Sequence, residues 1–395
     1  MPHYRYFIVG GGMTADAAVR GIREIDSKGS IGLLGREPHP PYYRPPLSKK
    51  LWQGKPLDSV WCKTEDLDVT LLLGRQAMAL DLPQKRVVDD QGTAHTFDRL
   101  LLATGGVPRR FSFGGDGILY FRTLDDYQKL RALSETRRRF AVIGGGFIGS
   151  EIAAALAMNG KEVVMAFPEE GIGARAFPGE LSQFLNRYYG ERGVEVLPRH
   201  TVTEVRPQGD GWAVVLRDAQ SALERVIQAD GLVAGIGIAP ETTLAEAAGL
   251  AVTNGVVVDE FLRAGHPDVY AAGDVANFYN PALGERLRVE HEDNALTMGR
   301  QAGRNMAGEA VPYHHLPYFY SDLFDLGYEA VGQLDARFEL HADWREPYRE
   351  GIVYYLHGGR VRGVLLWNVW DKVPAARTLI AEPGPFPAEY LKGRL

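Results

Sequence analysis

The sequence predicts an α/β fold with two Rossmann-like βαβ units and a small C-terminal α+β domain. Two glycine-rich turns, at 10–15 and 144–149, each lie between an apolar run and a helix-forming run. Further apolar runs stop at small residues, as buried strands of parallel sheets do; these runs are 100–103, 232–236 and 269–272. After residue 312, prolines, aromatic residues and a strand–turn–strand pattern indicate a separate small sheet.

The second glycine-rich turn has the pattern Gly-x-Gly-x-x-Gly between a strand (140–143) and a helix (151–158). In this context the pattern predicts a dinucleotide site, although a turn without a ligand is the alternative. Gly144 would allow the tight turn, Gly146 would let the backbone approach a pyrophosphate, and Gly149 would let the helix lie close to the strand. The free N–H groups at the start of the helix would bind the phosphates.

The first glycine-rich turn, residues 10–14, repeats this arrangement between a strand (6–9) and a helix (14–25). Ala15 stands where the third glycine would be, which the pattern tolerates. Two such motifs in one chain indicate two dinucleotides that are brought together, one of them a flavin.

The composition narrows the possibilities. A length of 395 residues suggests two to three domains, and a net charge of −6, from 44 basic and 50 acidic residues, argues against a general nucleic-acid binder. The one cysteine, Cys62, excludes an intrachain disulfide, and an incidental role is favoured over a catalytic one. No apolar run approaches the roughly 20 residues of a membrane helix, and a strand begins at the N-terminus. We therefore expect a cytoplasmic protein without a signal peptide, a membrane span or a metal site.

The other segments carry weaker signals. The stretch 37–50 contains five prolines, which exclude a regular helix or a central strand. It is either a stiff loop that positions side chains over a ligand or a plain connector. Four runs alternate like antiparallel strands, namely 193–197, 202–205, 212–216 and 223–228. Helices are expected at 122–133, 293–306 and 373–380, and a hairpin is expected from 351–356 and 361–368.

Several motifs occur in the order found in FAD-dependent pyridine nucleotide-disulfide oxidoreductases, namely 10–12, 44–49, 103–106, 144–149 and 272–274. The chain resembles the ferredoxin-reductase and apoptosis-inducing-factor-like branch of this family over nearly its whole length. Two features of that factor are missing. These are the mitochondrial leader and a long C-terminal insertion, since only about 15 residues join Leu334 to Gly351. The resemblance is therefore to a compact relative, and apoptotic roles do not carry over.

The resemblance implies a glutathione-reductase-like arrangement of domains. Residues 1–118 and 239–312 would form the FAD-binding domain and residues 119–238 the NAD-binding domain. Residues 313–395 would form the C-terminal domain. Monomer and homodimer both remain open.

By resemblance, the first βαβ unit binds FAD. Glu37, beside Arg36 after the second strand, would accept hydrogen bonds from the ribose hydroxyls. Asp274 would hold the ribityl chain or a phosphate-side hydroxyl, and Tyr320 stands where apoptosis-inducing factor has tryptophan. The full expected set is Gly10, Gly11, Gly12, Met13, Thr14, Arg36, Glu37, Arg44, Lys49, Ala77, Thr104, Gly105, Arg122, Asp274, Glu290, His291 and Tyr320.

The second βαβ unit would bind NADH. Phe147 would lie against the nicotinamide and Glu329 near its carboxamide. Because Glu169 and Glu170 end the second strand without an adjacent arginine, we expect NADH to be preferred over NADPH, although Arg175 could oppose this preference. The full expected set is Gly145, Gly146, Phe147, Ile148, Glu169, Arg175, Gly237 and Glu329.

Four residues are expected to act in hydride transfer: Lys49, Glu151, Phe147 and His291. Lys49 and Glu151 would form an ion pair next to flavin N5, because a buried unpaired charge is costly. Alternatively, Glu151 is a first-turn acid that only favours the helix dipole. The start of the helix near Asp293 would stabilise negative charge at flavin N1, unless the preceding His291 is only structural.

Two functions fit these expectations. The first is an NADH-dependent reductase that passes electrons singly to a ferredoxin, rubredoxin or quinone-like acceptor. The second is an NADH sensor that forms a stable charge-transfer complex and then switches partners or dimerises. The absence of a Cys-x-x-Cys motif excludes a dithiol relay and disfavours a disulfide or peroxide reductase. We favour the reductase, with a small electron-carrier protein as its partner.

Overall fold

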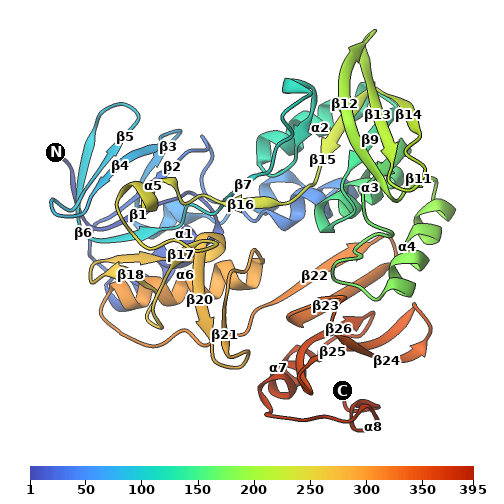
Figure 1. Cartoon of the computed structure of the whole chain (residues 1–395). Helices are drawn as coiled ribbons and strands as arrows, with labels where there is room; N and C mark the ends of the chain where they lie inside the picture. Colours follow the sequence, from blue (N-terminus) through green and yellow to red (C-terminus); the bar gives the residue numbers. More distant parts are fainter. The chain divides into compact units, whose positions relative to one another are not determined.

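The computed structural model describes residues 1–395, except for the side chain of Ala388, and divides into two compact units. Unit 1 comprises residues 1–43, 58–107 and 239–318, and unit 2 comprises residues 44–57, 108–238 and 319–395 (Figure 1). Within the described residues, no helix is long and apolar enough to cross a membrane. The chain passes between the units five times: on either side of residues 44–57, and near β7 (Gly106–Pro108), β16 (Ile238–Pro240) and the start of β22 (Tyr318–Leu323). The assignment of three domains to these segments remains a prediction.

Unit 1 is built on a sheet with the strand order β18-β19-β6-β1-β2-β3, from which β5 and β4 extend beyond β6. The strands from β19 to β3 run parallel. Its centre is almost entirely apolar, as predicted for strands covered on both faces. The strands are β1 (His3–Val9), β2 (Ile31–Gly35), β3 (Thr70–Leu73), β4 (Ala77–Asp81), β5 (Arg86–Asp89), β6 (Ala94–Leu102), β18 (Arg263–His266) and β19 (Val269–Ala271).

Two helices of unit 1 lie against each other, α1 (Met13–Ile25) and α6 (Glu292–Met306). A Cβ atom on Gly21 would lie 2.1 Å from the carbonyl oxygen of Arg300, and one on Gly303 would lie 2.1 Å from that of Ala18. Small residues on the facing sides of α1 and α6 therefore let the two backbones approach closely. Smaller elements complete unit 1: η4 (Thr64–Leu67), α5 (Thr243–Ala247), β17 (Val256–Val257), η6 (Gly273–Val275), β20 (Ala276–Asn280) and β21 (Glu285–Leu287).

Unit 2 contains a parallel sheet with the strand order β11-β10-β9-β15-β8. Its strands are β8 (Leu119–Tyr120), β9 (Arg139–Ile143), β10 (Glu162–Ala166), β11 (Val194–Leu197) and β15 (Gly231–Ala234). Its helices are α2 (Leu124–Thr136), α3 (Phe147–Met158) and α4 (Gly179–Glu191). The antiparallel sheet of β12 (His200–Gln208), β13 (Gly211–Asp218) and β14 (Glu224–Ala229) follows. The expectation that 193–197 is antiparallel was wrong, because β11 follows α4 and pairs parallel to β10; alternation of side chains does not encode strand direction.

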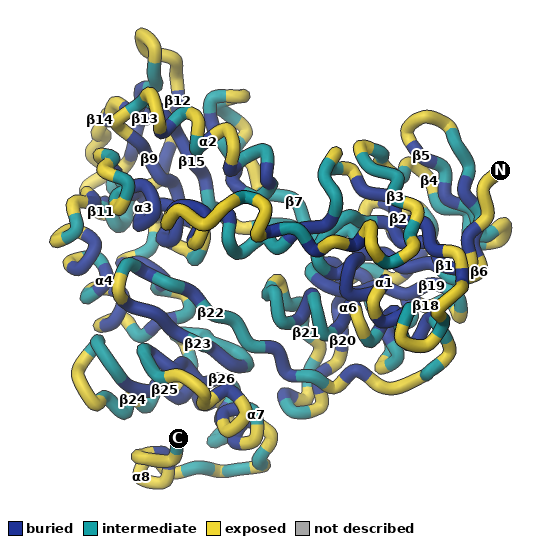
Figure 2. The backbone as a smooth tube through the Cα atoms, turned by 180° about the vertical axis from the view of Figure 1, so that it is seen from behind, coloured by how far each residue is buried: buried dark blue, intermediate teal, exposed yellow. Residues whose placement is uncertain are grey.

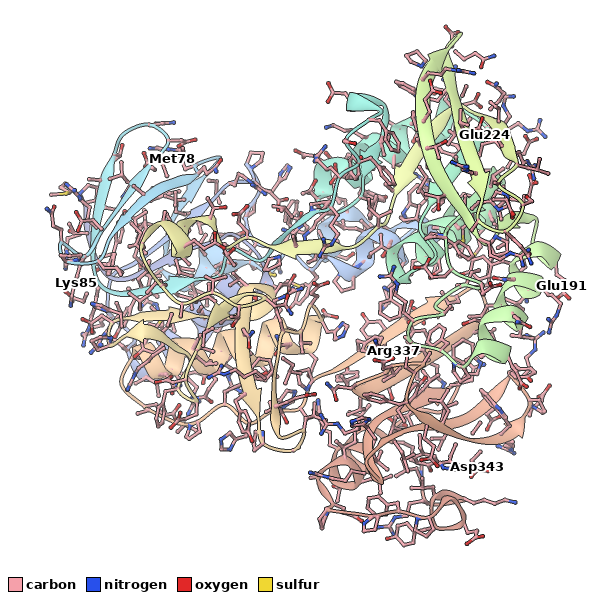
Figure 3. All side chains as sticks on the ribbon, viewed as in Figure 1. Met78, Lys85, Glu191, Glu224, Arg337 and Asp343 are labelled. Carbon is pink, nitrogen blue, oxygen red and sulfur yellow. The ribbon has the colours of Figure 1, made fainter. Side chains whose placement is uncertain are left out.

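The C-terminal part of unit 2 is a sheet with the order β22-β23-β26-β25-β24. The predicted hairpin is present as β25 (Glu350–His357) and β26 (Arg360–Trp367), and the predicted helix as α7 (Val373–Ala381). The other elements are β23 (Leu326–Gly332), β24 (Glu339–Glu346) and α8 (Ala388–Leu391). β25 and β26 are largely buried (Figure 2), whereas the charged side chains of Glu191, Glu224 and Arg337 in unit 2 are exposed (Figure 3).

The proline-rich stretch forms two short 3₁₀ helices in unit 2, η1 (Pro45–Ser48) and η2 (Lys50–Gln53). Two prolines start η1, where the fixed φ of proline suits a helix and its missing N–H costs nothing. The Trp52 indole N–H donates to the carbonyl of Leu47 over 2.8 Å, and Asn159 at the end of α3 donates to the carbonyl of Trp52 over 3.2 Å. The loop is therefore fixed to the helix that follows the second glycine-rich turn.

Candidate functional site

The glycine-rich turn of unit 1 leads from β1 into α1. Gly10 has a φ of +129°, and a Cβ atom there would lie 2.0 Å from the carbonyl oxygen of Ala103, so only glycine fits. Gly12 is the N-cap of α1, and a Cβ atom there would meet no described atom within 4 Å apart from those of its chain neighbours. The start of α1, at Met13 and Thr14, therefore has room for a phosphate group against the backbone.

The turn after β19 closes against the start of α1. Gly273 has a φ of +76°, and a Cβ atom there would lie 2.3 Å from Thr14 Oγ1. Arg288 donates to the carbonyl of Asp274 over 3.1 Å and pairs with Glu290 over 2.7 Å. Thr14, Asp274 and Glu290, which are all expected to bind FAD, thus belong to one connected part of unit 1.

Glu37 lies two residues beyond β2, at the carboxyl end of a parallel strand. Its Oε2 accepts a 2.5 Å hydrogen bond from the Tyr42 hydroxyl, which orients the carboxylate. The neighbouring Arg36 is exposed. A carboxylate fixed at the end of the second strand suits a ribose diol.

Thr104 and Gly105, which are also expected at FAD, form hydrogen bonds within the protein. The Thr104 hydroxyl donates to the carbonyl of Glu241 over 2.6 Å, and the Glu241 N–H donates to the carbonyl of Gly105 over 3.0 Å. These bonds fix the end of the strand at 100–103. Ala77 is the first residue of β4, where it pairs with Asp89.

His291 is the N-cap of α6. Burial lowers the pKa of its imidazole to about 4, against the raising effect of Asp274 and Asp293. The ring is therefore neutral near pH 7, and a helix N-terminus begins beside it. Asp293, in the first turn of α6, pairs with His315 over 2.6 Å and accepts the N–H of Tyr318 over 3.2 Å. A role for His291 at flavin N1 stays a prediction.

The glycine-rich turn of unit 2 has the geometry that its spacing predicts. Gly144 has a φ of +117°, and a Cβ atom there would lie 2.4 Å from the carbonyl oxygen of Gly235. A Cβ atom on Gly149 would lie 2.0 Å from the carbonyl oxygen of Gly144, so this glycine allows α3 to lie close to the strand. Gly146, the N-cap of α3, again has open space where its Cβ would be, as far as the described side chains reach. The start of α3 therefore also has room for a phosphate group against the backbone.

The loop after β10 reaches back to this turn. The Gly173 N–H donates to the carbonyl of Gly145 over 2.8 Å. Within the loop, Arg175 pairs with Glu169 over 2.7 Å; the arginine side chain is 84% exposed and the carboxylate 25% exposed. Glu169 and Arg175, the two residues expected at the adenosine of NADH, therefore form an ion pair with each other. Of the other expected residues, Ile148 is 40% exposed and Gly237 accepts a 2.9 Å hydrogen bond from the N–H of Arg109.

Phe147, the first residue of α3, lies beside an aromatic cluster of the C-terminal sheet. Its ring centroid is 5.1 Å from that of Phe319 and 6.4 Å from that of Tyr328, and Tyr328 stacks on Trp367 at 5.5 Å. Next to Tyr328, the buried Oε2 of Glu329 has no hydrogen-bond donor among the described residues, and burial raises the pKa of this carboxyl. A carboxamide N–H would supply the missing donor.

The predicted ion pair is present in unit 2. Lys49 Nζ lies 2.7 Å from Glu151 Oε1, and the two side chains are only 8% and 3% exposed. Lys49 Nζ also lies 5.5 Å from the ring centroid of Tyr320 on β22, a cation–π distance. Nearby, Arg44 donates to the carbonyl of Arg122 over 2.9 Å, just before α2.

Two details of this pair differ from expectation. Glu151 is not a first-turn acid, because α3 begins at Phe147, directly after its N-cap Gly146, and Glu151 is the fifth residue of the helix. Two serines that the sequence did not indicate also bond the carboxylate: Ser48 donates to Oε2 and Ser321 to Oε1, each over 2.5 Å. Ser48 stands next to Lys49 and Ser321 next to Tyr320, which was the available signal.

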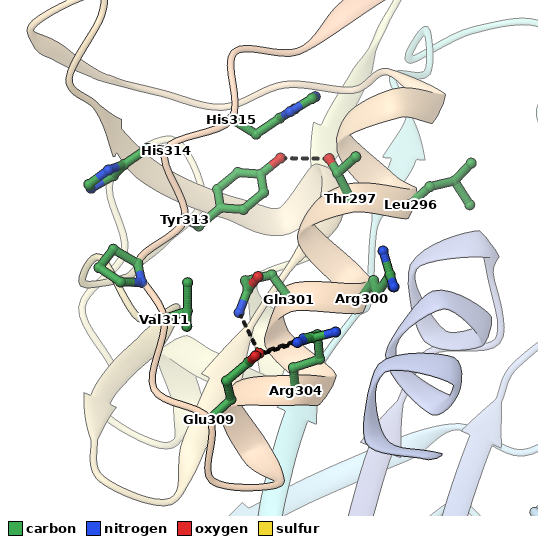
Figure 4. A pocket seen from close by; sticks show the side chains of 11 residues that line it. Leu296, Thr297, Arg300, Gln301, Arg304, Glu309, Val311, Tyr313, His314 and His315 are labelled. Carbon is green, nitrogen blue, oxygen red and sulfur yellow. Dashed lines mark hydrogen bonds and ion pairs between the residues drawn. The ribbon is translucent and has the colours of Figure 1, made fainter. Parts of the chain in front are cut away.

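A separate hollow of about 490 Å³ lies in unit 1, between α6 and residues 309–315 (Figure 4). Arg304 in its wall pairs with Glu24 and Glu309, and the Thr297 and Tyr313 hydroxyls lie 2.9 Å apart. The charges of this wall are largely balanced within it, so we assign no cofactor to the hollow. No cluster of His, Cys, Asp and Glu able to hold a metal occurs within the described residues.

Two family models match the sequence of this chain. The family model of pyridine nucleotide-disulphide oxidoreductases matches residues 4–299. The model for the C-terminal region of mitochondrion-associated apoptosis-inducing factor matches residues 302–344 and 339–382. The two matches together span nearly the whole chain.

Individual relatives agree with these matches. The ferredoxin reductase subunit of 5,5′-dehydrodivanillate O-demethylase from Sphingobium is 35% identical over 391 residues, which cover 97% of this chain and 94% of the relative. Apoptosis-inducing factor 1 of Dictyostelium discoideum is 32% identical over 424 residues, 95% of this chain and 78% of the relative. Among solved structures, putidaredoxin reductase in its covalent complex with putidaredoxin has a TM-score of 0.89 at 29% identity, covering 99% of this chain and 96% of that one.

Proposed function

The chain belongs to the pyridine nucleotide-disulphide oxidoreductase family as a flavoprotein oxidoreductase, and we propose that it is an NADH-dependent reductase that passes electrons to a small ferredoxin-type protein. The main support is that two helix starts, at Gly12 and Gly146, have open space in front of a glycine backbone. A protein that bound a single dinucleotide would need only one such helix start.

The residues present fit both cofactors. For FAD, the start of α1 would receive the pyrophosphate and the oriented Glu37 carboxylate the ribose. For the nicotinamide cofactor, the start of α3 would receive the pyrophosphate, and the unpaired Oε2 of Glu329 would accept from the carboxamide. When bound, this cofactor pair supplies transfer of a hydride to the flavin and release of electrons one at a time.

The side chains of the protein would align the two cofactors and adjust the charge around the flavin, since hydride transfer needs alignment more than acid–base chemistry. Phe147 is partly exposed, and the nicotinamide ring would lie against the face of its phenyl ring. The Lys49–Glu151 pair would present a fixed ammonium to the flavin without adding net charge to a buried region. A neutral His291 at the N-cap of α6 would leave the positive helix terminus available for negative charge.

We propose that NADH is preferred over NADPH. A 2′-phosphate at the end of β10 would meet the carboxylate of Glu169, and Arg175 is already paired with that carboxylate. The test is kcat/KM for both cofactors with a common acceptor. A clear preference for NADPH would refute this part of the proposal.

The proposed acceptor follows from two relatives that are named as ferredoxin reductases. This chain aligns with 94% of the length of each. Stopped-flow reduction of a ferredoxin, a rubredoxin and a quinone by the NADH-reduced protein separates the candidates. We expect fast turnover with the ferredoxin. Rapid reduction of the quinone alone would replace the protein acceptor by a small molecule.

A second candidate is an NADH-sensing flavoprotein, which is favoured by the match of the C-terminal region to apoptosis-inducing factor. It predicts slow oxidation, a persistent long-wavelength absorbance band after NADH addition and a change in molecular size. Size-exclusion chromatography with and without NADH, with absorbance detection, distinguishes it from the reductase.

A further inference from the structure

The Glu151 carboxylate is bonded on both oxygens inside unit 2. Oε1 receives Lys49 Nζ at 2.7 Å and the Ser321 hydroxyl at 2.5 Å, and Oε2 receives the Ser48 hydroxyl at 2.5 Å. Both serines are buried, at 4% and 1% exposure. Three donors on a planar group leave it little freedom to rotate.

The donors come from different parts of the chain. Ser48 ends η1 in the proline-rich stretch and Ser321 lies on β22, whereas Glu151 belongs to α3. The carboxylate therefore ties three segments together at one point. Because Lys49 follows Ser48 and Tyr320 precedes Ser321, the same bonds determine where the ammonium lies over the tyrosine ring.

An aromatic cluster lies beside Ser321. Ser321 is on β22, and the neighbouring strand β23 carries the fully buried Tyr328. The Tyr328 ring is held by stacking on Trp367 at 5.5 Å and by edge contact with Phe177 at 5.2 Å. The strand that carries Ser321 therefore lies beside a packed aromatic cluster, and Ser321 and Lys49 both bond the Glu151 carboxylate.

A buried ion pair is a poor device for holding one geometry unless its other hydrogen-bonding capacity is satisfied. Without the serines, the carboxylate would have one donor and would turn or draw the ammonium toward itself. We propose that Ser48 and Ser321 are positioning residues that act through Glu151 to fix the Lys49 ammonium at the flavin. This inference rests on the proposed reductase function, because only there does the position of the ammonium affect the reaction.

The test compares Ser48→Ala and Ser321→Ala with Ser134→Ala in the FAD-loaded protein. Ser134 is also buried in unit 2, but its hydroxyl donates to the carbonyl of Arg131, so it controls for loss of a buried hydroxyl. We measure the flavin midpoint potential, the visible spectrum, the limiting rate of flavin reduction by NADH and the Kd for NAD⁺. Each test variant should have a more negative potential and a limiting rate about tenfold lower, because one hydrogen bond to the charged carboxylate is lost, with an unchanged Kd. Ser134→Ala should match the wild type.

Two further variants show whether the effect passes through Glu151. In a Glu151→Gln background, Ser48→Ala should cause no additional change in rate or potential, because no carboxylate charge is left to position; a fully multiplicative effect would overturn the proposal. Ser48→Thr keeps the hydroxyl and should keep the wild-type potential, and a Thr variant that behaves like Ala would also overturn it. If the wild-type protein binds no FAD or is not reduced by NADH, the proposed function fails. If the wild type is reduced and the serine variants are unchanged, this inference alone fails.

Discussion

The open space at Gly146 leads to a sharp prediction: Gly146→Ala should leave the protein folded and weaken its binding of the nicotinamide cofactor. The backbone of Gly146 has φ −82° and ψ −170°, which alanine adopts without strain, and the new methyl group would meet no described atom within 4 Å outside its chain neighbours. The methyl group would instead occupy the space where we propose that a pyrophosphate approaches the start of α3.

The two effects differ in size. Alanine is a poorer N-cap than glycine but restricts the unfolded chain more, so the free energy of unfolding should change by less than about 1 kcal/mol. Displacing the phosphates should lose one charge-assisted hydrogen bond, worth about 1.5–3 kcal/mol, so the Kd should rise by about 10- to 100-fold. Gly149→Ala should behave differently, since its methyl group would lie 2.0 Å from the carbonyl oxygen of Gly144; overpacking should cost about 1–3 kcal/mol of stability.

Calorimetric titration with NAD⁺, which binds without reducing the flavin, gives the Kd, and urea unfolding gives the stability. Gly190→Ala is the matched control, because Gly190 lies on the exposed side of α4 with open space at its Cβ position. It should gain about 0.5–1 kcal/mol from helix propensity and bind NAD⁺ normally. Wild-type affinity in Gly146→Ala would refute the assignment of this helix start to a phosphate.

Three other predictions follow from single groups. Burial raises the pKa of the Cys62 thiol to about 12, so at pH 8 the native protein should resist alkylation that the urea-unfolded chain undergoes at once, as mass spectrometry would show. The folded His291 has a pKa of about 4 against about 6.5 when unfolded. The unfolded chain therefore binds more protons between these values, and stability should fall as pH falls from 6.5 to 4; His291→Gln should remove this component of the Tm profile. Glu169→Gln should release Arg175 and raise the kcat/KM ratio of NADPH over NADH by about tenfold, one charge-assisted contact, and an unchanged ratio would exclude both residues from the ribose end.

The sequence predicted what depends on local pattern. The two glycine turns were readable because Gly10, Gly144 and Gly149 leave no room for a Cβ atom, whereas Gly12 and Gly146 leave room for a ligand. The Lys49–Glu151 pair was expected from the resemblance to the family, and the two side chains lie 2.7 Å apart in the structure. The direction of β11 was not readable, since side-chain alternation is the same in parallel and antiparallel strands. Ser48 and Ser321 were missed because hydroxyls are common and only the folded chain brings them to one carboxylate.

The contact between α1 and α6 limits how the proposed flavin site can change. Where main chains touch at Gly21 and Gly303, there is no side chain between them to yield. Neither helix can slide or tilt without the other, so the proposed phosphate-binding start of α1 and the N-terminus of α6 should move together. Variation in flavin affinity between related chains should therefore arise in the loops around these helices, and engineering of the cofactor end is best begun there.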